Sequence, residues 1–161
     1  MPTKISKVDQ RELAIWAAKC AEHVLPYFER EYPNDSRPRK AIEVCRTWIR
    51  TGVFSMKVIR GASLSAHAAA RDTKKDSAAL YAARACGQAV ATAHVGEHAF
   101  GPSYYALKIA AIDPDTAEVK IAKELKWQSQ RLPKHLIKTW KDFQLKRFPK
   151  KLKELIKKSA K

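Results

Sequence analysis

The chain has few of the features that mark a secreted or membrane-bound protein. Its 161 residues include three cysteines, Cys20, Cys45 and Cys86, without the paired spacing of a disulfide framework, so we expect buried reduced thiols. No apolar run approaches the roughly 20 residues of a membrane span, and residues 1–7 contain no apolar signal segment. These absences predict a cytoplasmic protein, whose length suits one domain that needs no metal or disulfide for its core.

The sequence also lacks the motifs that identify most enzymes. It contains no Gly-rich phosphate loop, no nucleophile elbow, no paired catalytic carboxylates and no His-Glu-x-x-His zinc motif. We therefore expect no catalytic activity, no cofactor and no bound metal. One alternative stays open: His94 and His98, four residues apart, could bind a metal ion together with His67, as in a metal-dependent enzyme.

Acidic residues are half as frequent as basic ones, 16 against 32, which gives a net charge of +16. The excess is unevenly distributed along the chain. Residues 1–119 contain 17 basic and 13 acidic residues, whereas residues 120–161 contain 15 basic and 3 acidic residues. Most of the positive charge therefore belongs to the last quarter of the chain.

Strand-like alternation of apolar and polar residues is absent, and apolar residues recur with helical spacing instead. We predict an all-α fold, a compact bundle of about six to seven helices packed closely through Ala and Gly. Residues 1–148 would form a single domain. Residues 149–161 would form a Lys-rich amphipathic tail, either a short helix that docks on a partner or an anionic surface, or a frayed end. The expected helices run from Asp9 to a stop or bend at Pro26, from 35 or 36 to 52, over 55–71, over 77–98, from about 102, from 113–114, and from 133 to 148.

Small residues crowd the segment 61–111. Ala, Ser and Gly have little bulk, so helices over 62–71 and 77–98 could approach closely and enclose the polar groups between them. On a helix over 77–98, Arg84, His94 and His98 would share one face. Buried polar groups need partners, which makes this region the place to look for a site.

Residues 35–40 place three positive charges at the start of an expected helix. Arg37 and Arg39, together with free amide groups, could hold an anion there. The alternative is a solvated loop in which Arg37 pairs with Asp35 or another acid.

Four segments together resemble a known family. They are Arg-Pro-Arg-Lys-Ala-Ile-Glu at 37–43, Ala-His-Ala-Ala-Ala-Arg at 66–71, the segment from Ala82 to Val95, and Tyr-Tyr-Ala-Leu-Lys at 104–108. In this order they resemble small helical immunity proteins of bacterial polymorphic toxin systems, over residues 10–135. The resemblance implies a non-catalytic cytoplasmic protein that binds and neutralises a cognate toxin. The matching motif positions are Arg37, Arg39, His67, Arg71, Arg84, His94 and Tyr105, to which the helical pattern adds His98.

The positive charge departs from what an inhibitor of a nuclease toxin would need. A cationic active site is best covered by an anionic surface, so we expect an acidic protein partner. The alternative function is nucleic-acid or other polyanion binding through the C-terminal quarter, with affinity that falls steeply as salt rises. The residues that would contact phosphates are Lys134, Lys138, Lys141, Lys146, Arg147, Lys150 and Lys151.

Overall fold

The computed structural model describes residues 4–161, so the first three residues of the expected domain lie outside it. The described residues are all-α, as predicted. They form eight α-helices, more than the six to seven expected, because the Lys-rich tail is itself helical. The elements are α1 (Lys7–Glu29), α2 (Arg37–Thr51), α3 (Met56–Arg71), α4 (Ala78–Ala91), the 3-10 helix η1 (Gly96–Ala99), α5 (Phe100–Ala110), α6 (Ala117–Ser129), the 3-10 helix η2 (Lys134–Leu136), α7 (Ile137–Arg147) and α8 (Lys150–Ser159).

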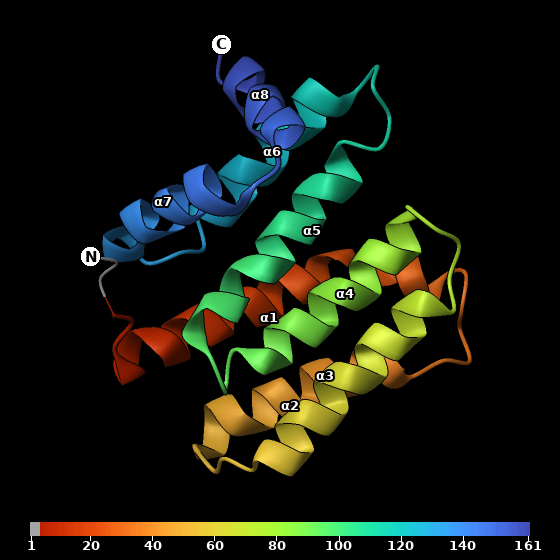
Figure 1. Cartoon of the computed structure of the whole chain (residues 1–161), viewed down its shortest axis with the longest axis vertical. Coiled ribbons are helices and arrows are strands. Elements are labelled where there is room, and N and C mark those ends of the chain that lie inside the picture. The colour runs from red at the N-terminus through yellow and green to blue at the C-terminus, as the bar shows by residue number, and fades with distance from the viewer. Residues whose placement is uncertain (1–3) are drawn as a thin grey trace.

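Helix α4 is the centre of the bundle. It packs against α1, α2, α3 and α5, and α5 leads from this bundle towards α6, α7 and α8 (Figure 1). Ala66, Ala69 and Ala70 on α3 and Ala82 and Ala85 on α4 are fully buried. Because these side chains end at Cβ, the backbones of the two helices approach closely. The predicted contact between the third and fourth helices is therefore confirmed.

Helix ends follow local signals in most places. The side chains of Ser6, Ser55 and Ser77 each accept a hydrogen bond from the backbone N–H three residues later, at the starts of α1, α3 and α4. Gly52 ends α2 in the left-handed conformation, with φ of 67°. The second and third helices accordingly match their predicted limits within about two residues.

The first helix differs from the prediction at both ends. It begins at Lys7 instead of Asp9, whose backbone N–H donates to the Ser6 side chain. It also continues past Pro26 to Glu29, so Pro26 does not stop it. Pro26 itself is exposed, while Phe28 is fully buried two residues later. Burial of this large ring offsets the hydrogen bond that the proline cannot donate.

The fourth helix is shorter than predicted, because it ends at Ala91 and not at His98. The side-chain amide of Gln10 on α1 donates to the carbonyls of Thr92 (2.8 Å) and Ala93 (3.2 Å). These carbonyls are thereby satisfied without a further helical turn. The predicted common face of Arg84, His94 and His98 on one helix is consequently wrong.

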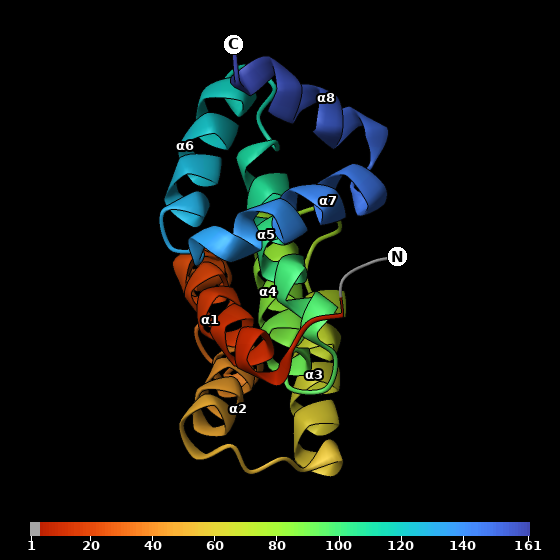
Figure 2. The same cartoon turned by 90° about the vertical axis from the view of Figure 1, so that its left-hand side faces the viewer.

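Helices α6, α7 and α8 form a cap at one end of the molecule (Figure 2). A chain of hydrogen bonds joins this cap to the bundle. The buried indole N–H of Trp140 donates to Ser103 (3.0 Å), Ser103 donates to Gln128, and Gln128 donates to Glu124 (2.8 Å). Glu124 then contacts His23 on α1 at 3.0 Å. The cap is therefore fixed to α5 by buried polar contacts and to α1 by a more exposed one, as well as by packing.

The apolar side of α8 is not free for another partner. Leu152 is 6% exposed and belongs to a second apolar cluster with Leu107 of α5, Ile121 of α6 and Phe148. The lysines of α8 face outward from this cluster, and most of them are exposed. Among residues 4–161, none of the helices combines the length and hydrophobicity that a bilayer-crossing segment requires.

Candidate binding site

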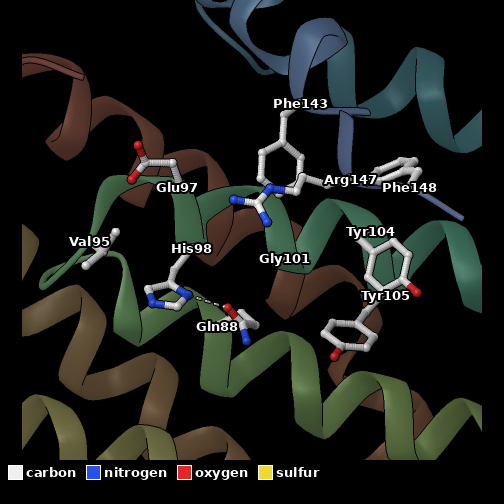
Figure 3. Close-up of a pocket in the computed structure, with 10 residues that line it drawn as sticks. All are labelled: Gln88, Val95, Glu97, His98, Gly101, Tyr104, Tyr105, Phe143, Arg147 and Phe148. Carbon is white, nitrogen blue, oxygen red and sulfur yellow. Dashed lines mark hydrogen bonds between the residues drawn. The ribbon is translucent and has the colours of Figure 1, made fainter. Parts of the chain in front are cut away.

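A cavity of about 510 Å³ lies where α4, η1, α5 and the end of α7 meet (Figure 3). Four aromatic rings and several polar groups surround it, and Arg147 points towards it from the end of α7. We call it the aromatic–basic cavity. Its lining consists of Gln88, Val95, Glu97, His98, Gly101, Tyr104, Tyr105, Phe143, Arg147 and Phe148.

The floor of this cavity depends on a close approach between α4 and α5. A Cβ atom added to Gly101 would lie 2.6 Å from Cβ and Cγ of Gln88, so only glycine fits there. The Gln88 side-chain oxygen is 2.7 Å from Nδ1 of His98, which therefore carries the proton and donates. Burial lowers the pKa of His98, and neighbouring His94 lowers it further. His98 is thus a neutral donor with a fixed orientation.

Tyrosines form the other wall of the cavity and continue beyond it. Tyr105 packs against Tyr104 and Tyr81, with ring centroids 5.0 and 6.1 Å apart. The ammonium group of Lys108 lies 4.6 Å from the centroid of the Tyr81 ring. Burial raises the pKa of Tyr105, an effect that the charge of Arg84 opposes. The wall therefore combines phenol hydroxyls with positive charge.

His67 and Arg84 lie together beside this wall, as the small-residue pattern predicted. The Arg84 guanidinium is 3.0 Å from Nδ1 of His67, and a Cβ atom on Gly87 would lie 2.7 Å from Nε2 of His67. Burial, reinforced by the charges of Arg84 and Arg71, lowers the pKa of His67 to about 4. His67 is thus neutral near pH 7, and its Nδ1 accepts the hydrogen bond from Arg84.

The remaining histidine of the predicted group lies elsewhere. His94 is exposed in the turn after α4 and stacks on Phe54, with ring centroids 6.5 Å apart. Within residues 4–161 no group of three or more His, Cys, Asp or Glu side chains could hold a metal ion. The metal-binding alternative therefore has no geometric support in the described part of the chain.

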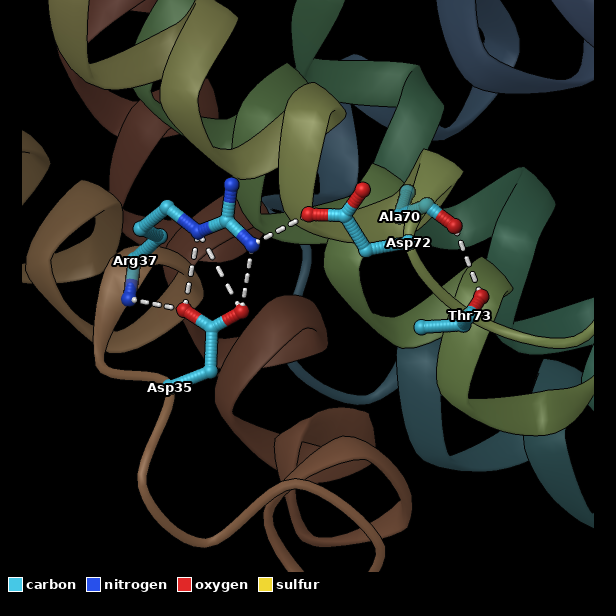
Figure 4. Close-up of polar contacts among 5 residues, drawn as sticks. All are labelled: Asp35, Arg37, Ala70, Asp72 and Thr73. Atoms are coloured by element: carbon cyan, nitrogen blue, oxygen red, sulfur yellow. Dashed lines mark hydrogen bonds and ion pairs between the residues drawn. The ribbon is translucent and has the colours of Figure 1, made fainter.

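Arg37 and Arg39 make ion pairs that fix the start of α2. Arg37 donates to Asp35 (2.6 Å) and to Asp72 (2.7 Å), as Figure 4 shows, and Arg39 donates to Glu29 (2.6 Å). These hydrogen bonds raise the pKa of Arg37, with the contact to Asp35 as the largest cause. Both guanidinium groups therefore already have carboxylate partners, so Arg37 follows the predicted alternative in which it pairs with Asp35, and the binding of a further anion stays a prediction.

The seven basic residues proposed for nucleic-acid binding are all exposed, and they lie along η2, α7 and the start of α8. Only Lys138 pairs with an acid among the described residues, with Asp142 at 2.7 Å. The aromatic residues of the same segment point inward, since Trp140 is 2% and Phe148 is 4% exposed. The segment thus offers positive charge to a ligand, and these two buried rings are not available for base stacking.

Sequence patterns missed several residues that line the cavity. Gln88 was not singled out, Phe143 was expected only as an inward-facing aromatic of the seventh helix, and Arg147 was assigned to the nucleic-acid alternative and not to the site that contains His98 and Tyr105. The positive charge of Arg147 at the end of a helix was visible in the sequence. The packing of α7 against α5 was not, because it depends on contacts between distant segments, such as that of Phe143 with Phe100.

The comparison with protein families identifies the relatives of this chain. The sequence profile described as "Imm-5 like putative immunity protein" matches residues 3–135. The chain belongs to that family. This Imm-5 like protein therefore falls in the broad class that the four sequence motifs indicated. Neither the curated proteins nor the solved structures yield a match to it. The matched part of the Imm-5 like chain contains α1 to α6, whereas α7, which supplies Arg147 to the cavity, lies beyond the match.

Proposed function

We propose that the protein neutralises a toxin by binding it through the aromatic–basic cavity, without catalysing a reaction. Membership of an immunity-protein family is the observation that carries the toxin-binding part of this proposal. The non-catalytic part of the proposal is supported by the sequence, which contains none of the catalytic motifs that would suggest chemical inactivation of a partner.

The cavity is the contact site that the geometry supports best. Its volume of about 510 Å³ can admit a side chain from a partner. Tyrosine and arginine are the residue types that most often dominate the energy of protein interfaces, and Tyr104, Tyr105 and Arg147 are grouped here. The net charge of +16 favours a partner with an acidic surface, because opposite charges accelerate association.

Co-expression tests this proposal. The gene is expressed together with the toxin encoded beside it, and both growth and complex formation are measured. We expect rescue of growth and co-purification of the two proteins. If the neighbouring product is neither bound nor neutralised, toxin neutralisation by this protein is wrong.

Charge reversal separates the cavity from the rest of the basic surface. Arg147→Glu should slow association about tenfold, since it reverses a charge where the partner docks. Lys57→Glu is the matched control, because Lys57 is an exposed cation on α3 that lies outside the family-like segments and does not line the cavity. Equal losses in both variants would show that the cavity is not the contact site, even if the complex forms.

We also propose a second function, binding of nucleic acid through phosphate contacts alone. The specific observation in its favour is the exposure of all seven basic residues along η2, α7 and the start of α8. Because Trp140 and Phe148 are buried, such binding would not depend on base identity.

A salt titration tests this second function. Duplex DNA and single-stranded RNA are titrated at several salt concentrations, and we expect log K to fall linearly with log salt. The double variant Lys141→Glu and Lys146→Glu should reduce the slope by about two, since each lost phosphate contact removes about one unit. Lys57→Glu and Arg60→Glu on α3 carry the same charge change as controls. No binding at low salt, or equal slopes in the two double variants, would exclude this function.

A further inference from the structure

Arg84 differs from the other partly buried arginines of the chain. Three arginines are neither fully exposed nor fully buried: Arg37, Arg46 and Arg84. Arg37 binds Asp35 and Asp72, and Arg46 binds Glu22 through two hydrogen bonds of 2.9 and 2.7 Å. Within residues 4–161, the only side-chain hydrogen bond of Arg84 goes to the neutral ring of His67. Arg84 is therefore the one of the three without a carboxylate partner in the described chain.

The hydrogen bond to His67 leaves most of the Arg84 guanidinium available. A guanidinium has five N–H donors, and one of them is used here. No buried side-chain nitrogen or oxygen among the described residues lacks a partner, so the other nitrogens of Arg84 are reached by solvent. His67 is itself packed against Gly87, which limits how far its ring can move. The Arg84 guanidinium is thus held by His67 on one side, and its remaining N–H groups are accessible to a ligand on another.

The surroundings of Arg84 are positive and contain a further donor. Arg71 follows His67 by one helical turn on α3, and both Arg71 and Arg84 act on the pKa of His67. The Tyr105 ring stacks on Tyr81, which precedes Arg84 by three residues on α4, and the Lys108 ammonium lies 4.6 Å from the Tyr81 ring centroid. Arg84 and Lys108 accordingly both act on the pKa of Tyr105. No Asp or Glu contributes to either pKa shift. The Tyr105 hydroxyl makes no hydrogen bond within the described residues, so it can donate to a ligand.

We propose that Arg84 and Tyr105 bind one oxyanion group, a carboxylate or a phosphate, with Arg71 and Lys108 contributing positive charge. The guanidinium fork matches two oxygens of such a group, and a hydroxyl donor completes the contact. Because Tyr105 also lines the aromatic–basic cavity, the oxyanion can be part of a larger ligand that occupies this cavity. The two sources of the group are an acidic side chain of a partner and a free phosphate. The site does not depend on the identity of any toxin.

Nuclear magnetic resonance of the wild-type protein tests this site directly. The side-chain Nε–Hε signal of Arg84 is followed while inorganic phosphate, or a hexaglutamate peptide, is added at constant ionic strength with chloride as the balancing anion. We expect this signal to shift to saturation with at least one of the two probes. Saturation with phosphate alone identifies a free anion as the ligand, and saturation with hexaglutamate alone identifies an acidic side chain. A linear drift with both probes, equal to that of chloride, overturns the proposal.

Variants distinguish a built site from general attraction by a cationic protein. Arg84→Lys keeps the charge but loses the fork, and we expect about tenfold weaker binding of the active probe. Tyr105→Phe removes only the hydroxyl and should weaken binding severalfold. Arg60→Gln is the control, because Arg60 is an exposed cation on α3, and its affinity should equal that of the wild type.

If Arg60→Gln weakens binding as much as Arg84→Lys does, the attraction is general and the site is wrong. Circular dichroism checks that each variant is folded. Should Arg84→Lys fail to fold, the wild-type titration and Tyr105→Phe decide the question. This test uses only the isolated protein. Oxyanion binding can therefore be found even if the protein neutralises no toxin, and it can be absent even if the protein does neutralise one.

Discussion

Glycines at three helical positions of this protein differ in how much space surrounds them for a Cβ atom. A Cβ atom at Gly101 would meet Cβ and Cγ of Gln88 at 2.6 Å, close to the backbone of α4, where little can move. At Gly87 the obstacle is the His67 ring, and at Gly61 no atom lies within 4 Å. The close contacts on either side of α4 therefore depend on two of these residues and not on the third.

Alanine substitutions should separate these cases. Gly101→Ala is expected to destabilise the fold by about 1–3 kcal/mol, because α5 must move away from α4. Gly61→Ala should stabilise it by about 0.5–1 kcal/mol, since alanine favours a helix interior and meets nothing there. Chemical denaturation measures both free energies of unfolding. A stabilising Gly101→Ala would contradict the close approach at the cavity floor.

His67 should make stability depend on pH. Its pKa is lowered from 6.5 to about 4 in the folded protein, so between these values the unfolded chain binds the proton more strongly. Stability therefore falls as pH decreases from 6.5 to 4, by about 2 kcal/mol once solvent screening is allowed for. His67→Gln keeps an acceptor for Arg84 but cannot titrate.

We expect the difference in the free energy of unfolding, wild type minus His67→Gln, to decrease as the pH is lowered from 6.5 to 4. His98, whose pKa is also lowered from 6.5, is present in both proteins and cancels in the difference. A difference that does not change with pH would show that His67 is not held in its neutral form.

Among the helices, those with signals at both ends were predicted best. Pro38 in the first turn and Gly52 after the last turn defined α2 from local chemistry. The end of α4 was missed because its decisive contact comes from Gln10, 82 residues earlier in the chain. The contact of His67 with Arg84 followed from small residues on adjacent helices. Arg147 was missed as a cavity residue because no local pattern shows which helix α7 covers.

The final helix should contribute to stability through one buried face. Leu152 is 6% exposed, whereas Leu145 at the end of α7 is 69% exposed. Leu152→Ala is expected to cost about 2 kcal/mol, the lower end of the range for buried leucine, because α8 is terminal. Leu145→Ala should change stability by less than about 0.5 kcal/mol. Thermal or chemical unfolding of the pair measures this contrast, and equal losses would mean that α8 is not docked as described.

On the scale of the whole molecule, the cysteines report whether the bundle unfolds as one unit. All three are free and buried, as the sequence indicated, and they lie on α1, α2 and α4. Burial raises the pKa of all three thiols, that of Cys45 to about 12.

The native protein at pH 8 should therefore not react with a thiol reagent except through unfolding. We expect Cys20, Cys45 and Cys86 to be modified at equal rates in mild denaturant, as measured by mass spectrometry of their peptides. Faster modification of one cysteine would show that its helix opens separately.

The ion pair between Arg37 and Asp72 has a topological consequence. It joins the first residue of α2 to the residue that follows α3, while the linker 52–55, exposed over 52–54, joins the other ends of the same helices. The two helices are thus connected at both ends, at one end by the peptide chain and at the other by an ion pair. A protease that cuts this linker would leave two fragments held together mainly by the packing of α1 and α2 on α3 and α4, with the ion pair fixing the far ends, so the cut would be visible only after denaturation.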